Sequence, residues 1–352
     1  MKKVAVGLAV AVLCAAIACA PEKTSLPRGD ASDELDAAWG ECINLFEHGL
    51  SEPQQLHSMM VVKDGKVVKE GWFNGAGPDI PHVLYSVSKS FTATAVGFAL
   101  SEGKLSLDDH VIDFFPGLLP DTVSENLSKM KVRHLLTMTC GHATDPSGRI
   151  VPKELMLNRK VNELDFDMRQ AFLAWPVDYD PDEAFFCYNS LGTYMLSAIV
   201  QTVTGLTVLD YLMPRLFEPL GIERPQWDES REGINLGGWG LFLKTEDMAK
   251  FGLLFLQDGI WNGKLVLPEE WVKEASSVQV ETAQTGWSVV RDWTYGYGFQ
   301  MWRSRHGFRA DGMFGQFILV LPEKNSVIVL TADINETQKE LDYVWQTIYP
   351  AL

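Results

Sequence analysis

The hydrophobic and polar positions of the chain divide it into two β-rich ends and a helical middle. Near the start, apolar residues recur at helical spacing from Ser32 to His48, and two β-prone runs then flank the turn signal Asp64-Gly65. Near the end, three β-prone runs precede a helix expected over Glu336 to Ile348. The five expected strands cover Met59 to Val62, Val67 to Phe73, Tyr297 to Arg303, Phe314 to Leu321 and Ser326 to Thr331.

The region between these ends is dominated by helical periodicity. Helices are expected over Lys131 to Met138, Asp167 to Ala174, Leu191 to Val203, Val208 to Phe217 and Thr245 to Leu256. This order predicts an α+β fold, an α/β sandwich in which an antiparallel sheet of about five strands is flanked by helices and carries an inserted all-helical lobe. The α/β lobe is expected to comprise residues 32–103 and 283–352, and the helical lobe residues 104–282. A functional site is expected in the cleft between the two lobes.

The first residues have the composition of an export signal. Lys2 and Lys3 precede an apolar run from Val4 to Ala18, and small residues lead to Cys19. This pattern resembles bacterial lipoprotein processing and predicts a signal peptide over residues 1–18, lipidation of Cys19 and a tether over residues 19–31. We therefore expect export to the bacterial cell envelope, with membrane contact through the lipid anchor only. A retained membrane helix is the alternative, which the shortness of the run disfavours.

Composition and charge limit the kinds of binding partner that we expect. The chain of 352 residues is 46% hydrophobic, which allows a large core, and it carries a net charge of −16 without a polybasic run, which argues against nucleic acid. The seven histidines lack metal-binding spacing, so no metal is expected. Beyond the leader, Cys42, Cys140 and Cys187 are odd in number and widely spaced, which favours free buried thiols over a disulfide framework, although one pair stays open. No oligomeric state is indicated.

A serine and a lysine three residues apart provide the first candidate chemistry. The Ser-x-x-Lys spacing occurs at Ser86/Lys89 and twice more, at Ser101/Lys104 and Ser128/Lys131. Only Ser86 follows a short β-prone run and opens an apolar helical stretch, where unpaired N–H groups favour developing negative charge. Lys89 would then be the base that activates the Ser86 hydroxyl. The alternative is that Ser86 is simply a helix cap.

A tyrosine before a second helix is the next candidate. Tyr188 precedes the amphipathic stretch that begins at Leu191. A tyrosine has a reference pKa of about 10, so it needs a nearby cation to act as a base, and Lys89 is the natural one. A purely structural role for Tyr188 is the alternative.

Taken together, these segments resemble the large family of serine hydrolases built like class C β-lactamases, which also contains D-alanyl-D-alanine peptidases, esterases and amide-oligomer hydrolases. The similarity runs from about Met59 to Asp333. The motifs that carry it are Tyr85-Ser86-Val87-Ser88-Lys89-Ser90-Phe91-Thr92, Gly103-Lys104-Leu105-Ser106-Leu107-Asp108-Asp109, Val132-Arg133-His134-Leu135-Leu136-Thr137-Met138-Thr139, Tyr188-Asn189-Ser190, Gly237-Gly238-Trp239-Gly240-Leu241 and Thr245-Glu246-Asp247-Met248-Ala249-Lys250-Phe251.

The resemblance implies roles for these residues. Ser86 would be the acylated nucleophile, with Lys89 and Tyr188 sharing the proton transfers. The oxyanion hole would consist of the backbone N–H groups of Ser86 and Met313, the latter following the triplet Ala310-Asp311-Gly312, where relatives have Lys-Thr-Gly or His-x-Gly.

The sequence departs from the family pattern at two motifs. Ala310 stands where relatives have a cation that steadies the tyrosine and a substrate carboxylate, so Arg309 or His306 would have to restore the charge, unless they are exposed hairpin residues. Ser190 stands where relatives have an asparagine, so either Asn189 turns inward or the amide contact to substrate is lost.

Further substrate-binding candidates are Asp311, Gly312, Trp239 and His142. Trp239 lies between glycines and would face either the substrate or the core, and His142 in a loop would line the mouth of the pocket or be structural.

Two functions follow. The first is a serine hydrolase that forms an acyl-enzyme with a small-molecule or short-peptide substrate, namely an ester, a short linear amide, a β-lactam or a D-amino-acid peptide. No cofactor is expected, because acyl transfer by a serine needs none. The second is a binding or sensor lipoprotein that retains the fold without turnover.

Overall fold

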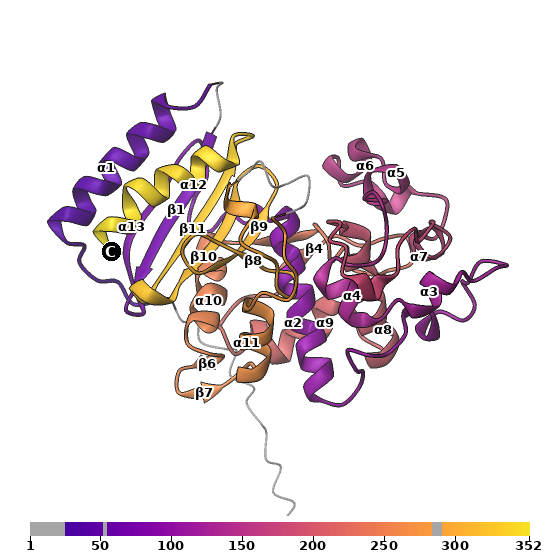
Figure 1. Cartoon of the computed structure of the whole chain (residues 1–352). Helices are drawn as coiled ribbons and strands as arrows, with labels where there is room; N and C mark the ends of the chain where they lie inside the picture. The colour runs from indigo at the N-terminus through magenta and orange to yellow at the C-terminus, as the bar shows by residue number, and fades with distance from the viewer. Residues whose placement is uncertain (1–24, 52–54, 284–290) are drawn as a thin grey trace, which may run out of the picture.

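One antiparallel sheet joins the two ends of the chain. The computed structural model describes residues 25–51, 55–283 and 291–352. Six strands pair in the order β2-β1-β11-β10-β9-β8 (Figure 1), which confirms the predicted fold class. Their bounds are β1 Gln55–Lys63, β2 Lys66–Trp72, β8 Trp302–Arg303, β9 Phe308–Gly312, β10 Gln316–Leu321 and β11 Ser326–Asp333.

Strand β9 is the part of the sheet that differs from the expectation. The predicted run from Tyr297 to Arg303 is a strand only at Trp302–Arg303, and Phe308–Gly312 forms a strand that the apolar pattern did not reveal. Arg309 and Asp311 alternate with buried Phe308 and Ala310, and the two charged side chains pair with each other at 3.0 Å. The sheet therefore has six strands instead of about five.

Alternate residues of the central strands face two different helical layers. Met59 and Val61 of β1 pack with α1 (Asp33–His48), α12 (Thr337–Gln346) and α13 (Ile348–Ala351), which lie over one face (Figure 1). Met60 and Val62 pack on the other side, in the cluster that includes α10 (Thr245–Leu256). The period of two along a strand produces this division. It makes the sheet the middle layer of a three-layer sandwich.

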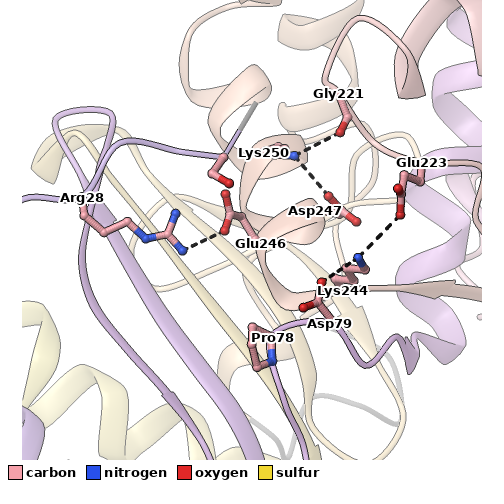
Figure 2. A pocket seen from close by; sticks show the side chains of 10 residues that line it. Arg28, Pro78, Asp79, Gly221, Glu223, Lys244, Glu246, Asp247 and Lys250 are labelled. Carbon is pink, nitrogen blue, oxygen red and sulfur yellow. Dashed lines mark hydrogen bonds and ion pairs between the residues drawn. The ribbon is translucent and has the colours of Figure 1, made fainter. Parts of the chain in front are cut away.

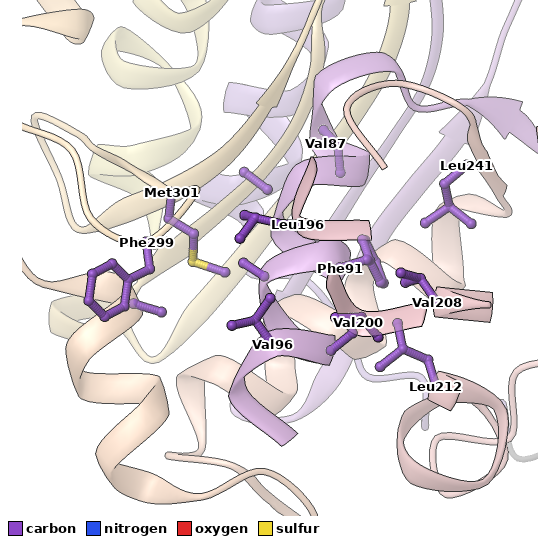
Figure 3. Packing of buried hydrophobic residues seen from close by; sticks show 14 of the residues in the cluster. Val87, Phe91, Val96, Leu196, Val200, Val208, Leu212, Leu241, Phe299 and Met301 are labelled. Carbon is purple, nitrogen blue, oxygen red and sulfur yellow. The ribbon is translucent and has the colours of Figure 1, made fainter. Parts of the chain in front are cut away.

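The helix α2 (Ser88–Ser101) forms the centre of the second core. It is buried on nearly all sides, because it packs against α8 (Ser190–Thr204), α9 (Val208–Leu212) and β9. Figure 3 shows Phe91 and Val96 of α2 among side chains from α8, α9 and the Phe299–Met301 segment. The ring of Phe91 stacks on that of Phe251 at 3.9 Å between centroids. Helix α2 is thereby fixed between the sheet and the helical lobe.

The other elements are short. The remaining helices are α3 (Glu125–Lys129), α4 (Val132–Thr137), α5 (Ser147–Ile150), α6 (Lys153–Leu157), α7 (Met168–Leu173) and α11 (Glu269–Ser276), and the remaining strands are β3 (His82–Val83), β4 (Gln226–Trp227), β5 (Leu241–Leu243), β6 (Ile260–Trp261) and β7 (Lys264–Leu265). Across the described ranges no single helix could span a membrane, although α8 and the Val208–Phe217 segment would qualify as a bent pair. Helix α10 belongs to residues 104–282, the range predicted as the helical lobe, but it packs on the sheet. The helical lobe therefore contains fewer residues than this range.

The N-terminal segment is folded against the body. The backbone N–H of Leu26 donates to Glu246 at 2.6 Å, and the N–H of Gly29 donates to the carbonyl of Val67 at 2.9 Å. The Leu26 side chain is buried, and Arg28 pairs with Glu246 at 2.8 Å. The predicted tether is therefore wrong for residues 25–29. The predicted signal peptide and Cys19 lie outside the described residues.

A polar cavity of about 270 Å³ lies beside this segment (Figure 2). Its cations have acidic partners: Lys244 contacts Asp79 at 3.0 Å, Lys250 contacts Asp247 at 3.3 Å, and Arg28 contacts Glu246. These pairs link the N-terminal segment, the loop before β3 and helix α10.

The cysteines within the described residues are free thiols. Cys42 and Cys140 are buried and Cys187 is half-buried. Burial raises the pKa of Cys42 to about 12 and that of Cys187 to about 11, which keeps both thiols protonated and unreactive near neutral pH.

Candidate active site

Ser86 lies in a tight turn that leads directly into α2. Residues Tyr85–Val87 form a 3-10 turn after β3, and Ser88 starts the α-helix. Tyr85 has a φ of 45°, which is unusual for a bulky residue, and its ring packs edge-on against Phe314 at 5.4 Å. The surrounding structure thus holds a strained backbone immediately before the serine, a feature that is frequent at functional sites.

Lys89 lies one turn further along, with its amine enclosed by oxygen atoms. Its side chain is 1% exposed, and Nζ donates to Ser86 Oγ at 2.8 Å, to Ser190 Oγ at 3.0 Å and to the Gly238 carbonyl at 2.6 Å. Burial lowers the pKa of Lys89 to about 7, although Asp145 and Asp311 oppose this shift. A large fraction of the amine is therefore neutral near pH 7 and able to accept a proton.

The two other Ser-x-x-Lys pairs have different surroundings. Ser101 is exposed and its hydroxyl donates to the Phe98 carbonyl at 2.9 Å. The Ser128 hydroxyl donates to the Glu125 carbonyl at 2.6 Å. Both serines bond to the backbone of their own helix, so neither hydroxyl is directed at its lysine.

Two glycines allow a loop to reach Lys89. A Cβ on Gly237 would lie 2.1 Å from Ser197 Oγ, and a Cβ on Gly238 would lie 2.6 Å from the Ser190 carbonyl. Thr92 Oγ1 donates to the Gly237 carbonyl at 3.1 Å and so fixes the loop against α2. The glycines of the Gly237-Gly238-Trp239-Gly240 motif therefore place the Gly238 carbonyl within hydrogen-bonding distance of the amine.

Tyr188 lies above the same amine. Its phenol hydrogen-bonds to Ser86, and Lys89 Nζ lies 5.0 Å from the centre of its ring. The ring stacks on Trp302 at 5.8 Å. Burial raises the pKa of Tyr188 above its usual value, so the phenol is protonated near neutral pH. It is placed to pass a proton rather than to act as a phenolate.

The two residues after Tyr188 have different roles. Ser190 lines the cleft and contacts Lys89, whereas Asn189 is fully buried and caps α8 by accepting from the Gly192 N–H at 2.9 Å. The Asn189 side chain also contacts His142 Nδ1 at 3.0 Å. Asn189 therefore does not line the cleft. Ser190 does, at the position where related proteins have an asparagine.

His142 lies behind the site instead of at its mouth. It is fully buried, packs edge-on against Phe172 at 5.2 Å, and burial lowers the pKa of its imidazole to about 4. The neutral ring supports Asn189 and does not line the cleft, so the expectation that it lines the pocket mouth is wrong.

Most of the other candidates meet in one cleft of about 450 Å³. Ser86, Tyr188, Ser190, Trp239, Asp311, Gly312 and Met313 all line it. Residues that sequence reasoning did not assign to the site also line it: Tyr85, Asp145, Lys153, Met156, Trp293, Trp302, Phe314, Ile334, Asn335 and Thr337. Of these, two had a sequence signal: Tyr85 opens the motif that contains Ser86, and Asp145 lies in a loop shortly after His142.

Arg309 and His306 do not supply a cation to the cleft. Arg309 is fully buried; its Nε donates to Asp311 Oδ2 at 3.0 Å and its Nη1 donates to the Asp292 carbonyl at 2.9 Å. His306 stacks on Tyr349 at 3.7 Å. Burial raises the pKa of Asp311 to about 6, although Arg309 opposes the shift, so this carboxylate is mostly ionised at pH 7. The charge that Asp311 brings to the surroundings of the Lys89 amine is therefore negative.

The turn that carries Met313 is fixed by hydrogen bonds from a buried glutamine side chain. Gln316 is fully buried, and its Nε2 donates to the carbonyls of Met313, Phe314 and Ala332 at 3.1, 3.1 and 2.7 Å. Phe314 and Gly315 have φ values of 63° and 85°. This side-chain amide fixes the turn that carries Met313, a residue that lines the cleft.

Comparisons with known proteins identify the family. The Beta-lactamase family model matches residues 52–351. A 6-aminohexanoate-dimer hydrolase of Paenarthrobacter ureafaciens is 25% identical over 77% of this chain and 71% of its own, and Penicillin-binding protein 4 of Amycolatopsis lactamdurans is 27% identical over 70% of each chain. The solved structure of a D-stereospecific amidohydrolase from Streptomyces sp. has a TM-score of 0.66 at 16% identity, covering 88% of this chain and 98% of its own. The chain therefore belongs to the β-lactamase family of hydrolases.

Proposed function

We propose that the protein is a serine hydrolase that cleaves an ester or amide through an acyl-enzyme on Ser86. The observation that carries the proposal is the buried Lys89 amine, 2.8 Å from Ser86 Oγ and with its pKa lowered to about 7. A hydroxyl beside a neutral amine in a cleft has the two groups that nucleophilic acyl transfer needs.

The reaction would proceed in two steps. Neutral Lys89 accepts the Ser86 proton, directly or through the Tyr188 phenol, as Oγ attacks the substrate carbonyl. The N–H groups of Ser86 and Met313 receive the oxyanion, each such donor contributing roughly 3 kcal/mol to the barrier reduction. The Lys89 ammonium returns the proton to the leaving group, and water activated by the same pair then hydrolyses the acyl-enzyme.

Esters and short linear amides are the substrates that the site supports best. Ala310 removes the cation expected for a substrate carboxylate, and neither Arg309 nor His306 replaces it. The names of two similar proteins, a 6-aminohexanoate-dimer hydrolase and a D-stereospecific amidohydrolase, point to amide cleavage. Peptides with D-residues and β-lactams rank second.

The test is hydrolysis of 4-nitrophenyl acetate by the wild type and by Ser86→Ala. We expect the variant to lose at least about 10³-fold in kcat/KM with an unchanged circular dichroism spectrum. Retention of the wild-type rate would show that Ser86 is not the nucleophile.

A sensor that is acylated without turnover is the second candidate, favoured by the altered motifs at Ser190 and Ala310. It would release one product equivalent in a burst and then stop. The hydrolase predicts a steady state after the burst.

We also propose that the protein is an exported lipoprotein anchored through Cys19. The basic, apolar and small-residue pattern before Cys19 supports this. Because Leu26 and Gly29 are fixed to the folded body, the anchor would hold that body close to the membrane. A Cys19→Ala variant that stays in the membrane fraction would disprove the lipid anchor.

A further inference from the structure

The cleft is lined by acids and aromatic rings. Among the described lining residues, the carboxylates are those of Asp145 and Asp311, and the rings are those of Tyr85, Tyr188, Trp239, Trp293, Trp302 and Phe314. Aromatic faces together with carboxylates bind ammonium groups well and bind carboxylates poorly. We propose that Asp311 is a specificity determinant that selects acyl substrates bearing an ammonium group and disfavours those bearing a carboxylate. This inference rests on the proposed hydrolase function.

The register of β9 places Asp311, and not Ala310, at the cleft. Ala310 is 3% exposed and its side chain packs against Phe251, Phe255 and Met301 on the opposite side of the strand. Successive side chains of a strand point to opposite faces, so Asp311 points the other way and its side chain is 11% exposed. The second residue of the triplet therefore sets the charge of this wall.

Arg309 lies behind Asp311 and does not reverse that charge. The guanidinium is fully buried and donates to the carbonyls of Asp292 and Arg303 and to Ser304 Oγ, as well as to Asp311. Because Asp311 lines the cleft and Arg309 does not, a substrate meets the carboxylate first. Arg309 keeps the carboxylate ionised and orients it.

The two lysines at the cleft do not offset this charge near Asp311. The Lys89 amine already donates to three oxygens. Lys153 is exposed on α6, where solvent and salt screen its charge. The remaining acid, Asp145, is also solvent-exposed and adds to the negative potential at the rim.

Three 4-nitrophenyl esters of equal chain length test the proposal: those of 6-aminohexanoic acid, hexanoic acid and adipic acid, the last as a monoester. For the wild type we expect kcat/KM to fall in that order, with the ammonium ester preferred over the carboxylate ester by about 10-fold or more. The preference should shrink as salt rises. A wild type that prefers the carboxylate ester would overturn the proposal.

Variants assign the preference to one residue. Asp311→Asn retains an oxygen that accepts from Arg309, and we expect it to reduce the ratio of the two charged esters to near 1. Asp121→Asn makes the same change in net charge at an exposed residue outside the lining and should leave the ratio unchanged. If Asp145→Asn removes the preference while Asp311→Asn does not, Asp311 is not the determinant.

A second measurement does not depend on the folding of Asp311→Asn. It compares inhibition of the wild type by hexylammonium and by hexanoate, and we expect hexylammonium to inhibit more strongly. Equal or stronger inhibition by hexanoate would contradict the proposal. The hexanoic ester distinguishes failure of the charge preference from failure of the proposed hydrolase function. Its hydrolysis, together with loss of activity in Ser86→Ala, supports the proposed function even when the charge preference is absent.

Discussion

The two walls of the cleft differ in how far they keep the family pattern. On the wall formed by α2 and the start of α8, Ser86, Lys89, Tyr188 and Ser190 form one hydrogen-bonded group around a buried amine. On the wall formed by β9, the triplet has lost its cation and presents Asp311. In the proposed mechanism the first wall would activate the nucleophile and the second would contact the substrate. The proposal therefore assigns the reaction and the choice of substrate to separate elements, and this separation can be tested by substitutions on each wall.

The largest expected effect comes from removing the amine on the first wall. Lys89→Met keeps the length of the side chain and removes the base, so we expect kcat/KM for a nitrophenyl ester to fall by about 10³-fold or more. Lys250→Met changes another buried lysine outside the cleft and should stay near the wild-type rate. Equal losses in both variants would mean that the Lys89 effect is structural.

The phenol on the same wall should matter less. Tyr188→Phe retains the stacking on Trp302 and removes the hydroxyl that contacts Ser86, and we expect a loss of about 10²-fold in kcat. Tyr343→Phe, in the core beneath the sheet, is the matched control. A Tyr188→Phe enzyme with the wild-type kcat would remove the tyrosine from the proton path.

The glycine loop that contacts Lys89 can be tested by adding a single methyl group. Gly238→Ala places a methyl group 2.6 Å from the Ser190 carbonyl, so we expect about 10-fold lower activity and a loss of about 1–3 kcal/mol in the free energy of unfolding. Gly40→Ala meets nothing within 4 Å in the middle of α1 and should stabilise the protein by about 0.5–1 kcal/mol. Thermal unfolding together with ester kinetics measures both effects.

The smallest effect on activity is expected behind the first wall. Asn189→Ala removes the cap of α8 and the contact to His142, which should cost about 1 kcal/mol of stability and change KM by less than about 3-fold. Ser190→Ala should instead change kcat, because Ser190 contacts Lys89. A large KM effect of Asn189→Ala would show that the amide does reach the substrate.

The sequence predicted the first wall better than the second. The Ser86/Lys89 spacing defines a local helical geometry, and Tyr188 and Asn189 precede a strongly periodic helix, so these positions follow from short-range rules. The strand β9 was missed because it contains two charged residues, Arg309 and Asp311, whose burial depends on an ion pair that only the folded sheet provides. The aromatic lining from Trp293, Trp302 and Phe314 depends on long-range packing in the same way.

The fold also has parts that the sequence predicted and parts that it did not. Periodicity predicted helices α1, α8 and α10 and an antiparallel sheet built from both ends of the chain, because each of these elements buries one regular face. The order of the strands in the sheet was not predicted. The docking of residues 25–29 was not predicted, since it depends on Glu246 and Val67, which are far away in sequence. The sequence left His142 open between the pocket mouth and a structural role, because a buried imidazole and an exposed one have the same local sequence signal.

The pH dependence of Ser86 labelling is the sharpest test of whether neutral Lys89 activates Ser86. A fluorophosphonate probe, followed by mass spectrometry of the modified peptide, should label Ser86 alone. The labelling rate should rise through pH 7 and then level off, because the Lys89 pKa of about 7 leaves the amine protonated below that pH and neutral above it. Labelling at another residue, or a rate at Ser86 that is constant between pH 5.5 and pH 9, would contradict a neutral Lys89 as the base that activates Ser86.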